Sequence, residues 1–166
     1  MVLQGNSAKH PLDKCIKRDD LHLLYVGISP NKPQRIGNPS KQNLRLKIKD
    51  HCQGNAESST LKLTLGCLLS NKLGIELRRV GKGRRMTFHD GEDILSQRMS
   101  ENAFVAWIVH EEPWRVEDKA IGQLSLPLNL RDNESHSFYR RLTSIRKDSK
   151  RKARAKSSIP RVRGIL

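Results

Sequence analysis

The stretch of sequence that decides the fold is LHLLYVGISP, residues 21–30. Residues 21–26 are β-compatible and apolar on both faces, a pattern typical of a buried central strand. Pro30 then opens a loop, because a proline biases the preceding residue away from the helical conformation. Tyr25 lies near the end of this predicted strand. Its phenol can either pack in a core or hydrogen-bond a phosphate oxygen or an attacking water, and the stretch alone does not separate these roles.

A helix is predicted after the loop, over residues 41–53. Leu44 and Ile48 are four residues apart and share one face, while Lys47 and His51 are also four apart and share another. We therefore expect one face of this helix to pack and the other to be cationic.

A second helix is predicted over residues 61–73, between the capping residues Ser58-Ser59-Thr60 and the terminating Gly74. Five leucines at helical spacing make a broad apolar stripe on it, which we expect to be its buried face: Leu61, Leu65, Leu68, Leu69 and Leu73.

The rest of the chain is predicted to form short strands and helices. Residues 75–80 and 84–88 predict a hairpin with basic strands, a short helix is expected near 94–100, a strand over 103–110, and a helix from Pro113 to about Leu124. The fold class expected is α/β of the α+β type: a small antiparallel β-sheet flanked by helices, with a basic helical C-terminal tail.

The 166 residues suit one domain plus a tail, and 32 Lys+Arg against 17 Asp+Glu leave a net charge of +15. A field of that sign attracts polyanions, nucleic acid first and an anionic membrane surface second. The sequence has no apolar run of about 18 residues and no apolar signal segment, so we expect a soluble, cytoplasmic protein that does not enter a membrane. The spacing of Cys15, Cys52 and Cys67 indicates neither a disulfide framework nor a zinc site.

The C-terminal residues 140–166 hold eleven Lys+Arg and one acid, Asp148. Such a block is typical either of a solvated, partly disordered face or of nucleic-acid contact. We expect three parts: a divergent or truncated N-terminal segment (1–20), a central domain (21–145) and a basic tail (146–166).

Phosphodiester hydrolysis is the chemistry that the remaining polar residues could support. Charge grows on the phosphate oxygens during cleavage, so cations and a metal ion must face them. Lys47 and His51 could supply donors, and Glu117 could bind a divalent ion such as Mg²⁺. Alternatively, Glu117 pairs at the surface with Arg115 or Lys119, and periodicity alone favours that interpretation. Nucleophilic serine or cysteine catalysis has no supporting signature, since no GxSxG is present.

An ordered set of motifs resembles the GIY-YIG nuclease family. Tyr25-Val26-Gly27, the following helix LRLKIKDH (44–51), Glu117 and the loop LPLNL (126–130) stand in the order that this family uses. The resemblance spans roughly residues 21–130, and the intervening stretch GNAESSTLKLTLGCLL (54–69) resembles one seen in a bacterial branch of small GIY-YIG domain proteins.

The resemblance implies an endonuclease, a hydrolase that cleaves DNA with one Mg²⁺ or Mn²⁺. By position, Tyr25 matches the second motif tyrosine, Lys47 the helix arginine and His51 the histidine after it. Glu117 matches the metal ligand and Asn129 the late asparagine. Basic residues expected to contact nucleic acid through phosphates are Arg45, Lys49, Arg84, Arg85, Arg146, Lys150, Arg151, Lys152 and Arg154.

Two departures from the family pattern leave an alternative open. Residues 1–20 contain no tyrosine, so either the chain begins late or a divergent segment replaces the leading GIY strand. Lys47 stands where the family has arginine, and lysine lacks the bidentate fork of a guanidinium. The alternative function is a catalytically inactive nucleic-acid-binding module, with RNA as an alternative partner to DNA. The oligomeric state is left open.

Overall fold

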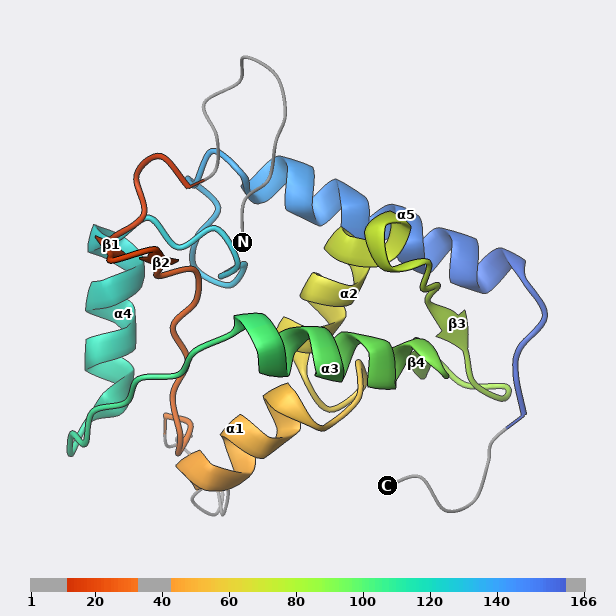
Figure 1. The fold of residues 1–166 in the computed structure, drawn as a ribbon, viewed down its shortest axis with the longest axis horizontal. Coiled ribbons are helices and arrows are strands. Elements are labelled where there is room, and N and C mark those ends of the chain that lie inside the picture. The colour runs from red at the N-terminus through yellow and green to blue at the C-terminus, as the bar shows by residue number, and fades with distance from the viewer. Residues whose placement is uncertain (1–11, 33–42, 161–166) are drawn as a thin grey trace. The chain divides into compact units, whose positions relative to one another are not determined.

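The computed structural model describes residues 12–32 and 43–160, and within them the chain forms five helices and two two-stranded antiparallel sheets (Figure 1). The predicted α+β fold class is confirmed. The strands are β1 (Lys17–Arg18), β2 (Leu21–His22), β3 (Arg78–Arg79) and β4 (Met86–Thr87); the helices are α1 (Leu44–Cys52), α2 (Thr60–Leu73), α3 (Gly91–Asn102), α4 (Pro113–Gln123) and α5 (Tyr139–Ala155).

The chain divides into two compact units. The first takes residues 1–48 and 104–141, and the second takes residues 49–103 and 142–166. The proposed boundaries near residues 20 and 145 stay predictions. None of the described helices is long and apolar enough to cross a membrane.

The first unit shows that the predicted central strand 21–26 is wrong beyond its second residue. In β2, Leu21 pairs with Arg18 and His22 with Lys17, and the chain then continues without strand geometry. Leu21 and Leu23 are exposed at 46% and 37%, so the segment is not buried on both faces. The reason is that its later backbone groups bond a loop instead of a strand: the Leu128 amide donates to the Leu24 carbonyl.

The predicted strand over residues 103–110 is also wrong. This segment is an extended link between α3 and α4 (Figure 1), and within the described part of the chain it joins no sheet. Phe104, Trp107 and Val109 are 74%, 65% and 95% exposed. The preference of apolar and aromatic residues for strands depends on packing and pairing with neighbours, and here these are lacking.

Helix α1 begins where Asn43 accepts a hydrogen bond from the Leu46 amide through Oδ1, at 2.9 Å. The predicted helix is confirmed over Leu44–Cys52, while residues 41 and 42 lie outside the described ranges. Leu44 and Ile48 are half-buried, as the packing face requires.

In the second unit, α2 begins and ends as the sequence predicts. Ser59 caps it by accepting from the Lys62 amide, and Gly74 ends it in the left-handed conformation with φ 64°. The buried face is not the leucine stripe, since of those leucines only Leu69 is fully buried. The buried residues instead combine two leucines with polar and small residues: Lys62, Leu63, Thr64, Gly66, Cys67 and Leu69.

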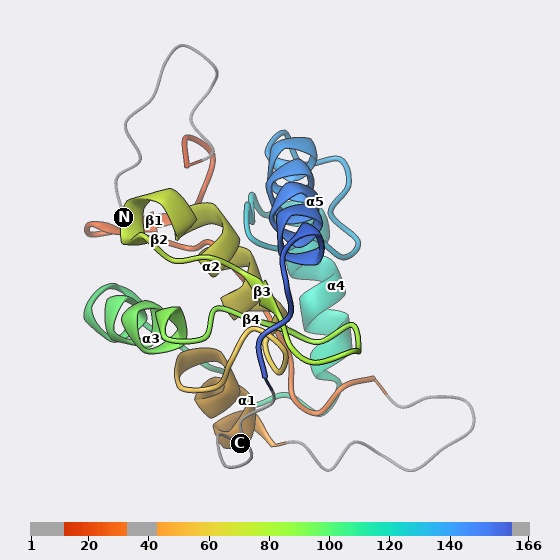
Figure 2. The ribbon, with the colours of Figure 1, turned by 90° about the vertical axis from the view of Figure 1, so that its right-hand side faces the viewer.

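The predicted hairpin is confirmed, with Arg78 opposite Thr87 and Arg79 opposite Met86, but its strands are shorter than the predicted 75–80 and 84–88. Figure 2 shows the loop that joins them. Helix α3 is longer than predicted and begins at Gly91, whose missing side chain leaves room for Ile75. The apolar core of this unit consists of Ala56, Leu63, Cys67, Leu69, Ile75, Leu77, Met86, Phe88, Leu95, Met99, Leu142 and Ala153.

The predicted basic C-terminal helix is confirmed as α5. Leu142 and Ala153 are its buried residues, while most of its cations are exposed. After α5, residue Ile159 bridges to Val80 in parallel, and residues 161–166 lie outside the described ranges.

Candidate active site

Glu117 and Tyr25 of the first unit share one electrostatic environment. Burial raises the pKa of the Glu117 carboxyl, the neighbouring Asp118 adds to this, and the positive charges of Arg131 and Lys47 oppose it. Burial also raises the pKa of Tyr25, with a further contribution from the negative charge of Glu117. Three predicted site residues, Tyr25, Lys47 and Glu117, are therefore close enough to interact electrostatically.

Helix α4 explains why Glu117 is half-buried. Pro113 occupies the start of the helix, where its missing N–H costs no hydrogen bond. Val116 and Ala120 are half-buried like Glu117, so the carboxyl lies on the packed side of the helix. The alternative surface pairing is not found in the described residues: Arg115 pairs with Glu112 at 3.0 Å, and no ion pair or hydrogen bond engages Glu117.

Asn129 holds the backbone beside Tyr25. Its Oδ1 accepts from the Val26 amide at 2.9 Å, and its Nδ2 donates to the Val26 carbonyl at 2.8 Å. The side chain thus copies the pairing that a neighbouring strand would provide, and it is only 6% exposed. The side chain of Asn133 in turn donates to the Leu126 and Asn129 carbonyls at 2.9 and 3.0 Å. Asn129 therefore positions the Tyr25-Val26-Gly27 segment.

The glycine of this segment makes room for the Tyr25 ring. A Cβ at Gly27 would lie 2.9 Å from Cε1 and 3.0 Å from the hydroxyl oxygen of Tyr25. Any side chain at residue 27 would therefore displace the phenol that the sequence places in the site.

Lys47 and His51 lie four residues apart on α1 and share a face, as predicted. His51 belongs to the second unit. Its Nδ1 lies 2.7 Å from the Ser59 hydroxyl oxygen, a contact that the sequence analysis did not anticipate.

The chemistry of Glu117 fits a hard divalent cation. Burial raises the pKa of this carboxyl although the positive charges of Arg131 and Lys47 oppose the effect, and a bound cation would favour the ionised form further. Within the described residues no group of three or more His, Cys, Asp or Glu side chains could enclose a metal ion. Mg²⁺ tolerates such a site, because it is usually bound by one or two carboxylates, waters and substrate phosphates.

The basic residues predicted to contact nucleic acid fall into two groups. Arg146 and Lys150 are half-buried, and their charges act on the buried thiol of Cys67 in α2. The others are exposed on α1, on the β3–β4 hairpin and on α5, and Arg85 among them pairs with Glu57 at 2.9 Å. The exposed group is Arg45, Lys49, Arg84, Arg85, Arg151, Lys152 and Arg154.

Three partners of the predicted site residues escaped sequence reasoning: Arg131 and Asn133 in the first unit, and Ser59 in the second. Asn133 follows Asn129 by four residues after the Pro127 turn, and that spacing was an available signal. Arg131 comes two residues after Asn129 and is 94% exposed in its side chain, where it also pairs with Asp132 at 3.3 Å. Its charge near Glu117 had no signal in the sequence.

A comparison with protein families finds a match. The family model described as "GIY-YIG catalytic domain" matches residues 2–148, which is most of the chain. No curated protein and no solved structure matched. The ordered motifs and the match over most of the chain lead to one conclusion: the chain belongs to the GIY-YIG catalytic domain family.

Proposed function

We propose that this protein is a divalent-metal-dependent endonuclease that hydrolyses DNA phosphodiester bonds with Glu117 as the metal ligand. Membership of the GIY-YIG family implies nuclease-type DNA cleavage at the level of the family. The observation that carries the proposal is the half-buried Glu117 carboxyl, which interacts with Tyr25 and Lys47 and has no hydrogen-bond partner in the described residues.

Each residue has a distinct role in this proposal. Glu117 holds Mg²⁺ or Mn²⁺, which as a Lewis acid would neutralise developing charge on the phosphate. Lys47 and Arg131 supply cations near the carboxylate, and the guanidinium of Arg131 offers the fork that Lys47 lacks. Tyr25 hydrogen-bonds the attacking water or a phosphate oxygen, and Asn129 holds the Tyr25 backbone in place.

The exposed cations of α5 would hold the duplex. Lys147, Arg151 and Arg154 are exposed and follow one another at spacings of four and three residues, so they line one face of the helix. Arg140 precedes Lys147 by seven residues and extends this face to a length of about 20 Å. Contacts from these side chains would reach phosphates without reading the sequence.

A nucleic-acid-binding module without catalysis is the second candidate. The sequence contains two tyrosines, Tyr25 and Tyr139, and residues 1–24 offer no second phenol. Lys47 in place of arginine further weakens the grip on a phosphate. This candidate predicts salt-sensitive binding of DNA without nicking, and comparison of RNA with DNA at matched salt would rank the two partners.

A plasmid-nicking assay separates the two candidates. The full chain is incubated with supercoiled plasmid in Mg²⁺, in Mn²⁺ and in EDTA. The nuclease proposal requires open-circular product with at least one of the two metals and none with EDTA. Binding of the plasmid without nicking under all three conditions would favour the module without catalysis.

A further inference from the structure

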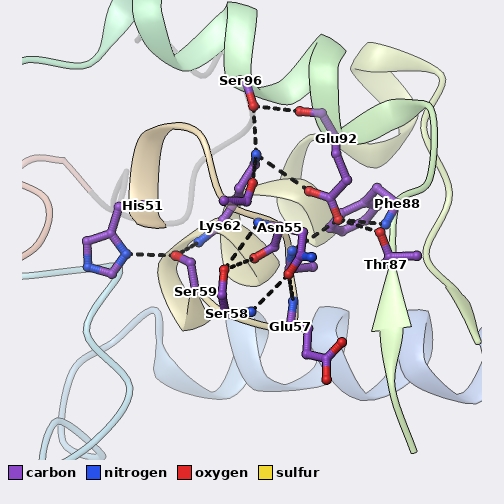
Figure 3. A network of polar contacts seen from close by, with 12 residues as sticks. His51, Asn55, Glu57, Ser58, Ser59, Lys62, Thr87, Phe88, Glu92 and Ser96 are labelled. Atoms are coloured by element: carbon purple, nitrogen blue, oxygen red, sulfur yellow. Dashed lines mark hydrogen bonds and ion pairs between the residues drawn. The ribbon is translucent and has the colours of Figure 1, made fainter. Parts of the chain in front are cut away.

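His51 is held by a segment whose position is fixed from several sides (Figure 3). The segment runs from Gly54 to Ser59 and connects α1 to α2. The ammonium of Lys62, which is 0% exposed, donates to the Gly54 carbonyl and to Ser96 Oγ, and it lies 3.6 Å from Glu92 Oε2. These contacts tie the end of α1 to the first turn of α2 and to α3.

The other oxygen of Glu92 fixes the middle of the same segment. Oε1 accepts from the Ala56 amide at 3.0 Å, from Thr87 Oγ1 at 2.8 Å and from the Phe88 amide at 2.9 Å. Within the segment, Asn55 Oδ1 accepts from the amides of Glu57 and Ser58, each at 3.0 Å. The segment is thereby held in one conformation, and Ser59 is placed with it.

The hydroxyl of Ser59 has few acceptors to which it can donate a hydrogen bond. Its oxygen accepts the Lys62 amide at 3.0 Å and lies 2.7 Å from His51 Nδ1, and the residue is only 1% exposed. No other acceptor for this hydroxyl is found in the parts of the chain that the structure describes. A buried hydroxyl that does not donate loses the free energy of a hydrogen bond. Donation to His51 Nδ1 is the arrangement that satisfies it.

We propose that Ser59 is a positioning residue for His51: its buried hydroxyl donates to Nδ1 and keeps the imidazole proton on Nε2. A neutral imidazole has one donor and one acceptor nitrogen, so an acceptor at Nδ1 makes Nε2 the donor. The tautomer itself is inferred from the geometry, while its consequence for catalysis rests on the proposed nuclease function. With Nε2 protonated, a neutral His51 can only donate through that nitrogen, to a phosphate or leaving-group oxygen that reaches this buried atom, and cannot act there as the base that activates water.

The tautomer is measured directly by two-bond ¹⁵N–¹H NMR of the ¹⁵N-labelled full chain, at a pH where His51 is neutral and with His51→Gln for assignment. The wild type is expected to show a non-protonated Nδ1 and a protonated Nε2. Ser59→Ala should shift His51 toward a mixture of tautomers, and Ser59→Thr should restore the wild-type pattern. Ser58→Ala, which removes a neighbouring hydroxyl that bonds Asn55, serves as the matched control and should leave it unchanged.

A protonated Nδ1 in the wild type, or an unchanged pattern in Ser59→Ala, would overturn the inference. The nicking rate gives a second readout: Ser59→Ala should lower it about tenfold, as when an oriented hydrogen-bond donor to the phosphate is partly lost, with rescue by Ser59→Thr. The NMR result does not depend on cleavage. A protein with the expected tautomer but no nicking would contradict the nuclease function alone, and a nicking protein with the opposite tautomer would contradict only the role of Ser59.

Discussion

The side chain of Asn129 forms two hydrogen bonds with the backbone of Val26, a residue 103 positions earlier in the chain. Asn129→Ala would leave the Val26 amide and carbonyl without these partners. Because unsatisfied polar groups in a partly buried site are costly, we expect unfolding of the first unit to become easier by about 2 kcal/mol. Both tryptophans, Trp107 and Trp114, belong to this unit, so urea unfolding followed by tryptophan fluorescence measures it.

A control variant for this loss is Asn71→Ala, which removes an exposed amide from α2. It should change stability by no more than about 0.5 kcal/mol. Equal stability of Asn129→Ala and the wild type would contradict the role of Asn129 as a backbone clamp.

The contact between Gly27 and the Tyr25 ring predicts a coupled pair of substitutions. Gly27→Ala places a Cβ 2.9 Å from Cε1 of Tyr25, so the ring must move, at a cost of about 1–3 kcal/mol. In a Tyr25→Ala background the same change should cost much less, because the obstructing ring is absent. A double-mutant cycle on the free energy of unfolding measures this coupling. Additive effects of the two substitutions would show that the ring does not pack on Gly27.

His136 predicts a pH dependence of stability in the first unit. Its Nδ1 accepts the Phe138 amide at 3.1 Å and its Nε2 lies 3.0 Å from Ser125 Oγ, while burial lowers its pKa below the usual value. The unfolded chain therefore takes up the proton first as the pH falls. Stability should drop below pH of about 6.5 and level off once the folded form is protonated too.

Replacing this histidine should flatten the pH profile. His136→Gln is expected to lose most of the drop between pH 7 and pH 5, measured as the urea midpoint of the tryptophan signal. His110→Gln, at an exposed histidine, should keep the wild-type drop. An unchanged profile in His136→Gln would assign the pH dependence to other groups.

The exposed face of α5 predicts the salt dependence of DNA binding. Replacing Lys147, Arg151 and Arg154 together by alanine removes three phosphate contacts, so the slope of log affinity against log salt should fall by about 0.9 for each. Fluorescence anisotropy of a labelled duplex at several salt concentrations gives the slope. The control replaces Lys14, Lys72 and Lys119, three exposed lysines outside α5, with the same change in net charge. Equal slopes for the two variants would mean that net charge alone sets the salt dependence of DNA binding, and not the position of these cations on α5.

The sequence predicted those elements whose signals are local. Helix α2 lies between a serine cap and a terminating glycine, and the β3–β4 hairpin has a glycine-containing turn, so both could be found without knowledge of the rest of the chain. Helix α4 was equally clear, because Pro113 marks its first turn.

The elements that failed depend on distant partners. Residues 103–110 have strand-forming side chains, but within the described chain no neighbouring strand completes the hydrogen bonding, so they stay irregular and exposed. The buried face of α2 was mispredicted for a similar reason: Lys62 is buried because Glu92 and the Gly54 carbonyl satisfy its charge. A sequence pattern treats a lysine as exposed and cannot pair it with an acid 30 positions away.

The residues of the candidate site also differ in whether the sequence could predict them. The order of Tyr25, Lys47, Glu117 and Asn129 was visible in the sequence, and these four residues lie in the same unit. Among the partners of these residues, Asn133 had a signal in its spacing of four from Asn129, whereas the effect of Arg131 on Glu117 is recognised only when charges and distances are known.

The most direct test of the central claim compares Glu117→Gln with Glu111→Gln in the plasmid-nicking assay with Mg²⁺ or Mn²⁺. Both changes remove one glutamate charge from the same part of the chain, but Glu111 is exposed and lies outside the candidate site. If Glu117 binds the metal ion, Glu117→Gln should lose nicking by at least about 100-fold, as when a group that stabilises transition-state charge is removed, while Glu111→Gln stays at the wild-type rate. Nicking by Glu117→Gln at the wild-type rate would contradict the assignment of Glu117 as the metal ligand.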